Sequence, residues 1–330
     1  MLRRLRTFTV SSRQFAYASY AALATLVLIV FTGSAVRLTG SGLGCPTWPR
    51  CYEDGQLYAE LNTHATIEFA NRLLTSVVGG AALACAVLVW RIRPVRRDLR
   101  LLAHLPLLGV LAQIVLGGIT VRMDLAPGPV MAHFALSMVI LVGAVALVWR
   151  VHHPAGHRPP GSDRLMVWGA RGLAAFGGVV IVAGTAATAA GPHAGGDGTG
   201  DVVNRLHFRG ADTLDWTIHQ HARLAAVLGI AAVALWVALR RRGADKRVQH
   251  ALTAICVMLA AQGVIGTAQY ALELPAEIVW VHVGLAACTW VAIVFAAVAA
   301  GRLTKARQRR GAPPPERPSA PTERRDPVAA

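Results

Sequence analysis

The sequence predicts an all-α, polytopic membrane protein with eight transmembrane helices. Of its 330 residues, 54% are hydrophobic and only 15% are charged, and the apolar residues are gathered into runs of about 20, the length at which a helix crosses a bilayer. Backbone polar groups in lipid have to be satisfied within the segment, which requires helices rather than open strands. We expect spans at 16–36, 67–90, 101–121, 130–150, 168–190, 220–240, 250–271 and 278–300.

The positions of the basic residues predict how these spans are oriented. The net charge is +16, and the arginines and lysines crowd the two termini and every second loop, whereas the intervening loops are richer in Asp and Glu. By the positive-inside rule, both termini then lie in the cytoplasm and the first loop lies outside the cell (plasma) membrane. A nucleic-acid partner would need a contiguous basic face. We therefore expect the lipid bilayer, and no nucleic acid, around this chain.

The chain starts with a basic cytoplasmic segment, 1–15, and the first span. Arginines before an apolar run also mark cleaved signal peptides, but the run at 16–36 is too long and ends without a small-x-small cleavage site, so we interpret it as a span. The outer loop that follows contains Cys45 and Cys51, separated by five residues, two of them prolines. On the oxidising side of a membrane, a disulfide or a reversible dithiol is favoured over two free thiols.

The second span opens with a polar stripe on one helix face. Its members, at spacings of four, three and four, are His64, Glu68, Asn71 and Thr75. Glu68 is the unusual member, because an unpaired carboxylate inside an apolar helix is costly. One interpretation is an ion pair with Arg72, four residues on. The other is a general base or proton acceptor beside a cofactor.

The later spans repeat the earlier ones. A shift of 149 residues places Gln113 on Gln262 and His133 on His282, with the histidine twenty residues after the glutamine in both halves. We therefore predict two pseudo-symmetric four-helix bundles, at 16–150 and 168–300. A cytoplasmic linker, 151–167, joins them, and residues 301–330, rich in Pro and Arg, are expected to form a disordered cytoplasmic tail.

A shift of 150 residues aligns the second span with the sixth, so that Asn71 falls on His221 and Glu68 falls on Ile218. Only the first half therefore has a carboxylate at this depth, which equips that half alone for proton chemistry.

Histidines near the outer ends of the even-numbered spans indicate haem binding. They are His64, His133, His221 and His282. Two neutral imidazoles from neighbouring helices coordinate a haem iron in the core of a bundle, which gives one potential site per half. A single interfacial histidine usually makes ordinary hydrogen bonds, but four at repeat-related positions favour a function, because ionisable groups in a membrane are costly.

At these residues the chain resembles the haem A synthase family, membrane enzymes that supply haem A to terminal oxidases. The resemblance covers roughly 16–300. It is carried by RLTGSGLGCPTWPRC (Arg37 to Cys51), EFANR (Glu68 to Arg72), His133, HQHAR around His221, and His282. It implies oxidation of haem O to haem A, in which a methyl group becomes a formyl group through successive hydroxylations and loss of water.

The resemblance also implies a division of labour. The N-terminal half would hold the substrate haem, with Glu68 catalytic, and the C-terminal half would hold a b-type haem. The pair Cys45 and Cys51, as a disulfide, would assist redox chemistry or haem transfer. Haem O synthase and terminal oxidase assembly proteins would be the protein partners.

Arginines near these sites suit the anionic haem propionates. The candidates are Arg72, Arg223 and, at the end of the first span, Arg37. Anchoring at the membrane interface is the alternative role.

The chain departs from the family pattern where Glu-x-x-His-Arg is common, because Asn71 stands in place of that histidine, and asparagine is a poor ligand of haem iron. The first-half site is then five-coordinate through His133 or uses His64. In the second half, Ala222 separates His221 from the arginine.

Two other classes of function compete with the enzyme. A quinol-linked cytochrome b electron carrier would hold both haems permanently and modify neither, and repeated bundles also occur in transporters. Glu68 and the unequal halves favour the enzyme over the carrier. The repeats look parallel and lack broken helices at the membrane midplane, which disfavours the transporter.

Overall fold

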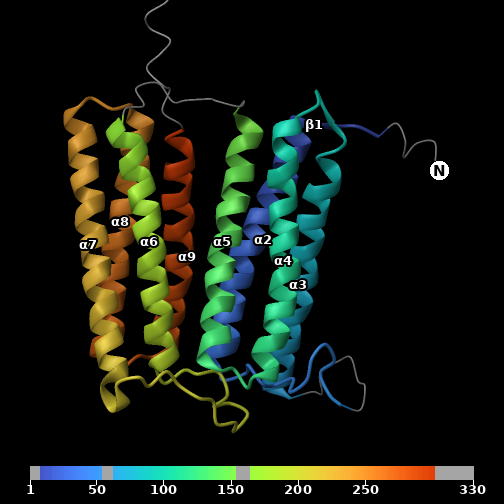
Figure 1. Cartoon of the computed structure of the whole chain (residues 1–330), viewed down its shortest axis with the longest axis vertical. Coiled ribbons are helices and arrows are strands. Elements are labelled where there is room, and N and C mark those ends of the chain that lie inside the picture. The colour runs from blue at the N-terminus through green and yellow to red at the C-terminus, as the bar shows by residue number, and fades with distance from the viewer. Residues whose placement is uncertain (1–7, 54–61, 154–163, 302–330) are drawn as a thin grey trace, which may run out of the picture.

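The structure is a computed structural model that describes residues 8–53, 62–153 and 164–301. In these ranges it has 8 helices long and apolar enough to cross a membrane (Figure 1). They are α2 (Ser12–Leu38), α3 (Thr63–Leu88), α4 (Arg100–Arg122), α5 (Pro127–His152), α6 (Arg164–Ala190), α7 (Thr213–Arg241), α8 (Lys246–Ala271) and α9 (Ala276–Ala299). The all-α membrane fold and its eight spans are confirmed.

Local signals in the sequence explain several helix ends. Ser11 caps α2 and forms a reciprocal capping box with Gln14. The side chain of Asn62 accepts from the amide of Ala65 at the start of α3. The sixth span begins earlier than predicted, at Thr213, because a 3-10 turn, η2 (Gly210–Asp212), leads directly into α7.

Both ends of the predicted linker, 151–167, are helical, because α5 continues to His152 and α6 begins at Arg164. The rest of that linker, the first seven residues and the predicted tail from 302 onward lie outside the described residues. Two short strands, β1 (Val10–Ser11) and β2 (Ile92–Arg93), pair in parallel and join the start of the chain to the segment between α3 and α4.

The helices form two four-helix groups that stand side by side (Figure 1). Each helix packs against the next one in the chain, and α5 closes back on α2 as α9 closes back on α6. Helices α2 and α5 also pack against α9, and α5 packs against α6. At this junction the indole of Trp290 on α9 donates to the carbonyl of Met138 on α5 at 2.9 Å. That the groups are related by an internal repeat remains a prediction.

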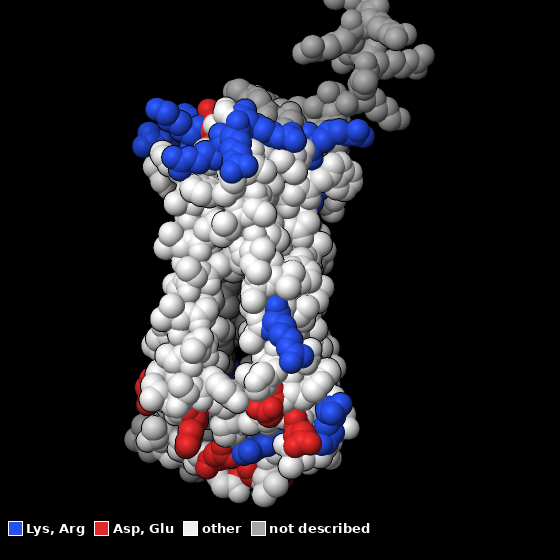
Figure 2. Space-filling view, turned by 90° about the vertical axis from the view of Figure 1, so that its left-hand side faces the viewer, with Lys and Arg blue, Asp and Glu red and all other residues white. Residues whose placement is uncertain are grey.

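Charge separates along the long axis of the molecule. On the face seen in Figure 2, Lys and Arg cover one end, and Asp and Glu gather at the other, where a few basic residues also lie. We call the first the basic end and the second the acidic end. The connections α2–α3, α4–α5, α6–α7 and α8–α9 lie at the acidic end (Figure 1).

At the acidic end, two glycine-rich segments from different helix groups bind each other. Gly42 donates its amide to the carbonyl of Gly195 at 2.8 Å, and Gly198 donates to Gly40 at 3.2 Å. We call these two hydrogen bonds the glycine clamp. A side chain would not fit here, because Gly40 has a φ of +67° and a Cβ on it would overlap the backbone of Gly198.

Arg37 adds a further tie between the two helix groups. From the end of α2 it donates to the carbonyl of His193 at 2.8 Å and to that of Thr188 at 3.1 Å. The segment between α6 and α7 is thereby fixed to the first helix group.

Candidate functional site

Two histidines face each other in the second helix group. The rings of His221 on α7 and His282 on α9 have centroids 6.2 Å apart and planes inclined by 74°. An imidazole–metal bond is about 2 Å long, so two imidazoles on opposite sides of one metal have ring centres roughly 6 Å apart. The spacing of these rings therefore fits two axial ligands of one iron.

The orientation of the His221 ring also suits a metal ligand. Its Nδ1 lies 3.0 Å from the carbonyl oxygen of Val180 on α6. Because a carbonyl only accepts, Nδ1 carries the proton and Nε2 keeps its lone pair, which is the arrangement typical of ligating histidines. The Nδ1 of His282 is buried without a hydrogen-bond partner among the described residues, so this ring lacks the backbone contact that orients His221.

Small residues and glutamines surround these histidines in the same way in both helix groups. Gln262 donates to the carbonyl of His282 at 3.1 Å, and Gln113 donates to that of His133 at 2.8 Å. A Cβ on Gly266 would lie 3.3 Å from the His282 ring, and one on Gly117 would lie 3.4 Å from the His133 ring. The residue matches that suggested the repeat thus correspond to equivalent contacts.

In the first helix group, His133 lies on α5, and its Nδ1 is also buried without a hydrogen-bond partner among the described residues. Asn71 on α3, which the repeat aligns with His221, instead accepts a hydrogen bond of 2.7 Å from the hydroxyl of Thr32 on α2. The first group therefore offers a histidine and an amide where the second offers two histidines.

His64 lies in the first turn of α3, at the acidic end. Its Nδ1 is 2.9 Å from the hydroxyl of Ser41. Its ring stands directly against Gly198 of the α6–α7 segment, where a Cβ would overlap it. These contacts hold His64 next to the glycine clamp.

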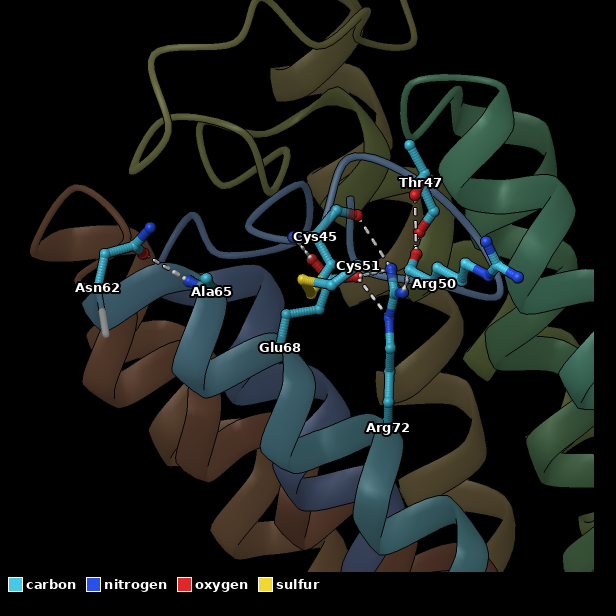
Figure 3. Close-up of a disulfide and its surroundings, with 8 residues drawn as sticks. All are labelled: Cys45, Thr47, Arg50, Cys51, Asn62, Ala65, Glu68 and Arg72. Carbon is cyan, nitrogen blue, oxygen red and sulfur yellow. Dashed lines mark hydrogen bonds and ion pairs between the residues drawn. A yellow bond between two sulfur atoms is a disulfide. The ribbon is translucent and has the colours of Figure 1, made fainter. Parts of the chain in front are cut away.

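Cys45 and Cys51 form a disulfide in the segment between α2 and α3. Of the two arrangements left open by the sequence, the structure has the bonded one. Both cysteines are buried, and the loop that they close lies directly over α3 (Figure 3).

Glu68 points from α3 into this disulfide loop (Figure 3). Its side chain is buried, with the residue 5% exposed. One carboxylate oxygen, Oε2, accepts the amide of Cys45 at 2.7 Å. The other, Oε1, forms an ion pair with Arg72 that includes a hydrogen bond of 3.1 Å from its Nε. The ion pair considered from the sequence is thus present, and the carboxylate also contacts the disulfide loop.

The candidate arginines differ in their surroundings. Arg72 is directed at Glu68 and at carbonyls of the disulfide loop (Figure 3). Arg37 is directed at the α6–α7 segment, as described above. Arg223 is exposed on α7 and lines a surface hollow with Trp216, His219 and Gln220.

Two residues at these sites were not predicted from the sequence. They are Thr32, the partner of Asn71, and Gly184, where a Cβ would lie 2.9 Å from the ring of His221. Gly33 stands 151 residues before Gly184, so the repeat carried a signal for this glycine.

Fold and site together define an integral membrane protein of eight helices, with facing histidines in one half and a buried carboxylate under a disulfide in the other. The chain belongs to the COX15-CtaA family of cytochrome oxidase assembly proteins, whose model matches residues 16–294.

Two curated relatives are both named heme A synthase. The chain is 32% identical to that of Bacillus pumilus over 124 residues, 37% of this chain and 40% of the relative. It is 31% identical to that of Lysinibacillus sphaericus over 138 residues, 41% of this chain and 44% of the relative. The matched part thus spans less than half of the length of these relatives.

Proposed function

We propose that the protein is a haem A synthase, an oxidoreductase that converts a methyl group of haem O into the formyl group of haem A through successive hydroxylations and loss of water. The family and the names of the relatives support haem A biosynthesis. The observation that carries the proposal is the inequality of the two halves. One half has the facing pair His221 and His282, and the other has His133, Asn71 and the buried Glu68.

In this proposal the second half, 168–300, holds a b-type haem between His221 and His282. A bound haem supplies one-electron redox chemistry. Val180 fixes the orientation of the His221 ring, and the glycines beside both rings leave room for them. Arg223, exposed on the same helix as His221, is the arginine that we assign to a haem propionate.

The first half, 16–150, takes haem O as its substrate, with His133 as the iron ligand and His64 as the alternative second ligand. Asn71 leaves the site without the second histidine that the repeat would supply. A less firmly held iron suits a site that has to release its product. We assign Glu68 the role of a general base or proton acceptor beside the haem, a task for which a carboxylate is suited.

We also propose the cell (plasma) membrane as the location, with both termini in the cytoplasm and the disulfide loop outside. The charge separation in Figure 2 supports this orientation, because basic residues favour the cytoplasmic side.

A cytochrome b electron carrier remains the second candidate function. The contacts of Glu68 are compatible with it, because a carboxylate bonded to Arg72 and to the amide of Cys45 would also serve a purely structural role.

The test is to express the full chain with haem O supplied and to analyse the extracted haems by chromatography and mass. Haem A is the expected product. A protein with a normal cytochrome b spectrum that leaves haem O unchanged would support the carrier and reject the enzyme.

A further inference from the structure

Arg72 makes an unusually complete set of contacts for one side chain. A guanidinium has five N–H donors in a fixed fork. In this structure they are directed at two kinds of acceptor, the carboxylate of Glu68 and three backbone carbonyls of the disulfide loop. Nε and Nη2 donate to Oε1 of Glu68. Nη2 also donates to Cys45 O at 3.0 Å, and Nη1 donates to Thr47 O at 2.9 Å and to Arg50 O at 3.5 Å.

These contacts hold the peptide groups of Cys45 from both sides. The amide of Cys45 donates to Glu68 at 2.7 Å, and its carbonyl accepts from Arg72. Since Glu68 and Arg72 lie on one face of α3, four residues apart, the helix presents a matched acceptor and donor to one end of the disulfide loop (Figure 3).

Two alternatives for Arg72 are weaker on these contacts. An arginine that binds a haem propionate would need donors directed at that anion, whereas each donor position of Arg72 already has a protein acceptor. An interfacial anchor would be exposed to headgroups, whereas the Arg72 side chain is only 20% exposed and is paired with a carboxylate that is 7% exposed.

We infer that Arg72 is a positioning residue, which holds the carboxylate of Glu68 and the Cys45–Cys51 loop in one fixed arrangement. This inference rests on the proposed function in one respect, that Glu68 is the carboxylate used in the reaction. The loop acts as a lid on Glu68, and the intact disulfide keeps the three carbonyls within reach of a single guanidinium.

A linkage follows between the disulfide and the pair formed by Glu68 and Arg72. The contacts of Glu68 and Arg72 with the loop depend on the disulfide, so they stabilise the oxidised form of the cysteine pair. By linkage, the disulfide stabilises those contacts by the same free energy. Weakening the contacts should therefore make the disulfide easier to reduce. A dithiol reagent reduces it by giving two electrons and two protons, which yields two cysteine thiols and the cyclic disulfide of the reagent.

The experiment measures this reduction in the purified full-length protein. The protein is equilibrated with graded ratios of reduced to oxidised dithiothreitol, the thiols are blocked with a maleimide, and the gain of two labels on the Cys45–Cys51 peptide is followed by mass spectrometry. Arg72→Lys keeps the charge but presents one ammonium instead of a fork. We expect its half-reduction ratio to fall at least tenfold relative to wild type.

Arg241→Lys, the same change at an exposed arginine in the last turn of α7, is the matched control and should leave the ratio unchanged. Glu68→Gln is the second variant, because it keeps an acceptor for the Cys45 amide but loses the ion pair, and we expect a shift in the same direction. The helical circular dichroism of each variant, compared with that of the wild type, shows that it has folded.

An unchanged half-reduction ratio in folded Arg72→Lys and Glu68→Gln would overturn the inference. A variant whose affinity for haem O changes while its half-reduction ratio does not would also overturn the inference. It would indicate that Arg72 binds a haem propionate instead. The thiol measurement needs no haem O, so it stands apart from the proposed function. If the wild-type chain forms no haem A, the proposed haem A synthase function is rejected. The half-reduction ratios still test whether Arg72 holds the disulfide loop.

Discussion

The imidazoles of His221 and His282 approach each other from α7 and α9 with ring centroids 6.2 Å apart, although they are far apart in the chain. His221 is oriented by the Val180 carbonyl of a third helix, and His282 is held at its own backbone carbonyl by Gln262 on a fourth. All four helices of the second group therefore contribute to the position of this pair.

Replacing either histidine of this pair should remove the second-half haem. In His282→Ala, one of two axial ligands is lost, and we expect haem content to fall by about tenfold or more, since even indirect changes around metal ligands cost 10 to 100-fold in affinity. The measurement is the low-spin absorbance of purified protein. His219→Ala is the control, because His219 is exposed on α7, two residues before His221. Equal haem loss in both variants would contradict the assignment.

Glu68→Gln should stop haem A formation while the second-half haem is retained. Proton transfer by a positioned carboxylate contributes roughly 10² to 10⁴-fold to a rate, so we expect haem A to fall by at least about 100-fold. Chromatography of extracted haems measures this.

The same substitution at Glu277, in the first turn of α9, is its control, and Glu68→Asp tests whether a carboxylate alone is sufficient. Wild-type haem A production by Glu68→Gln would remove Glu68 from the catalytic role.

Gly184→Ala should disturb the second-half site, because the new Cβ would lie 2.9 Å from the His221 ring, closer than real contacts allow. The ring has to move, and we expect a shifted haem spectrum and weaker haem retention. Gly33→Ala is the control in the other half, since nothing lies within 4 Å of a Cβ there. It should be neutral or stabilise its helix by up to about 1 kcal/mol, as measured by thermal unfolding. Identical spectra for both variants would show that Gly184 does not set the position of His221.

Asn71→His should give the first half a second histidine at the position that the repeat aligns with His221. We expect the iron of bound haem O to become low-spin and haem A to be released more slowly, because the iron would be held from two sides. Electron paramagnetic resonance of the substrate-loaded protein measures the spin state.

His64→Ala separates the remaining possibility for the wild-type chain. If the iron spectrum of His64→Ala loaded with haem O equals that of the wild type, His64 is not a ligand. For Asn71→His, an unchanged iron spectrum would show that residue 71 of α3 does not face the iron.

The sequence was sufficient for the helices, because runs of apolar residues and their flanking charges are local properties. It missed the early start of α7, where Thr213 and Thr217 continue the helix into the loop through hydrogen bonds to backbone carbonyls. A polar helical turn ahead of an apolar run leaves no hydropathy signal, so the predicted start at 220 was late.

The candidate site was only partly predictable. Spacing by four identified the pair of Glu68 and Arg72, because both lie on one helix face. The carbonyl acceptors of Cys45, Thr47 and Arg50 were not predictable, because every residue carries the same carbonyl and only the path of the loop selects these three. Hydrogen bonds across helices, such as that of Thr32 with Asn71, depend on helix rotation, which composition does not specify.

The glycine clamp has a consequence for how the molecule is held together. Its two hydrogen bonds, with those of Arg37 and Trp290, join the halves at both the loops and the helices, and none of them depends on the peptide link between α5 and α6. If the two halves are expressed as separate chains, divided between residues 154 and 163, they should therefore associate in the membrane. The covalent joining of the halves would then serve to deliver equal numbers of each, rather than to hold them in place.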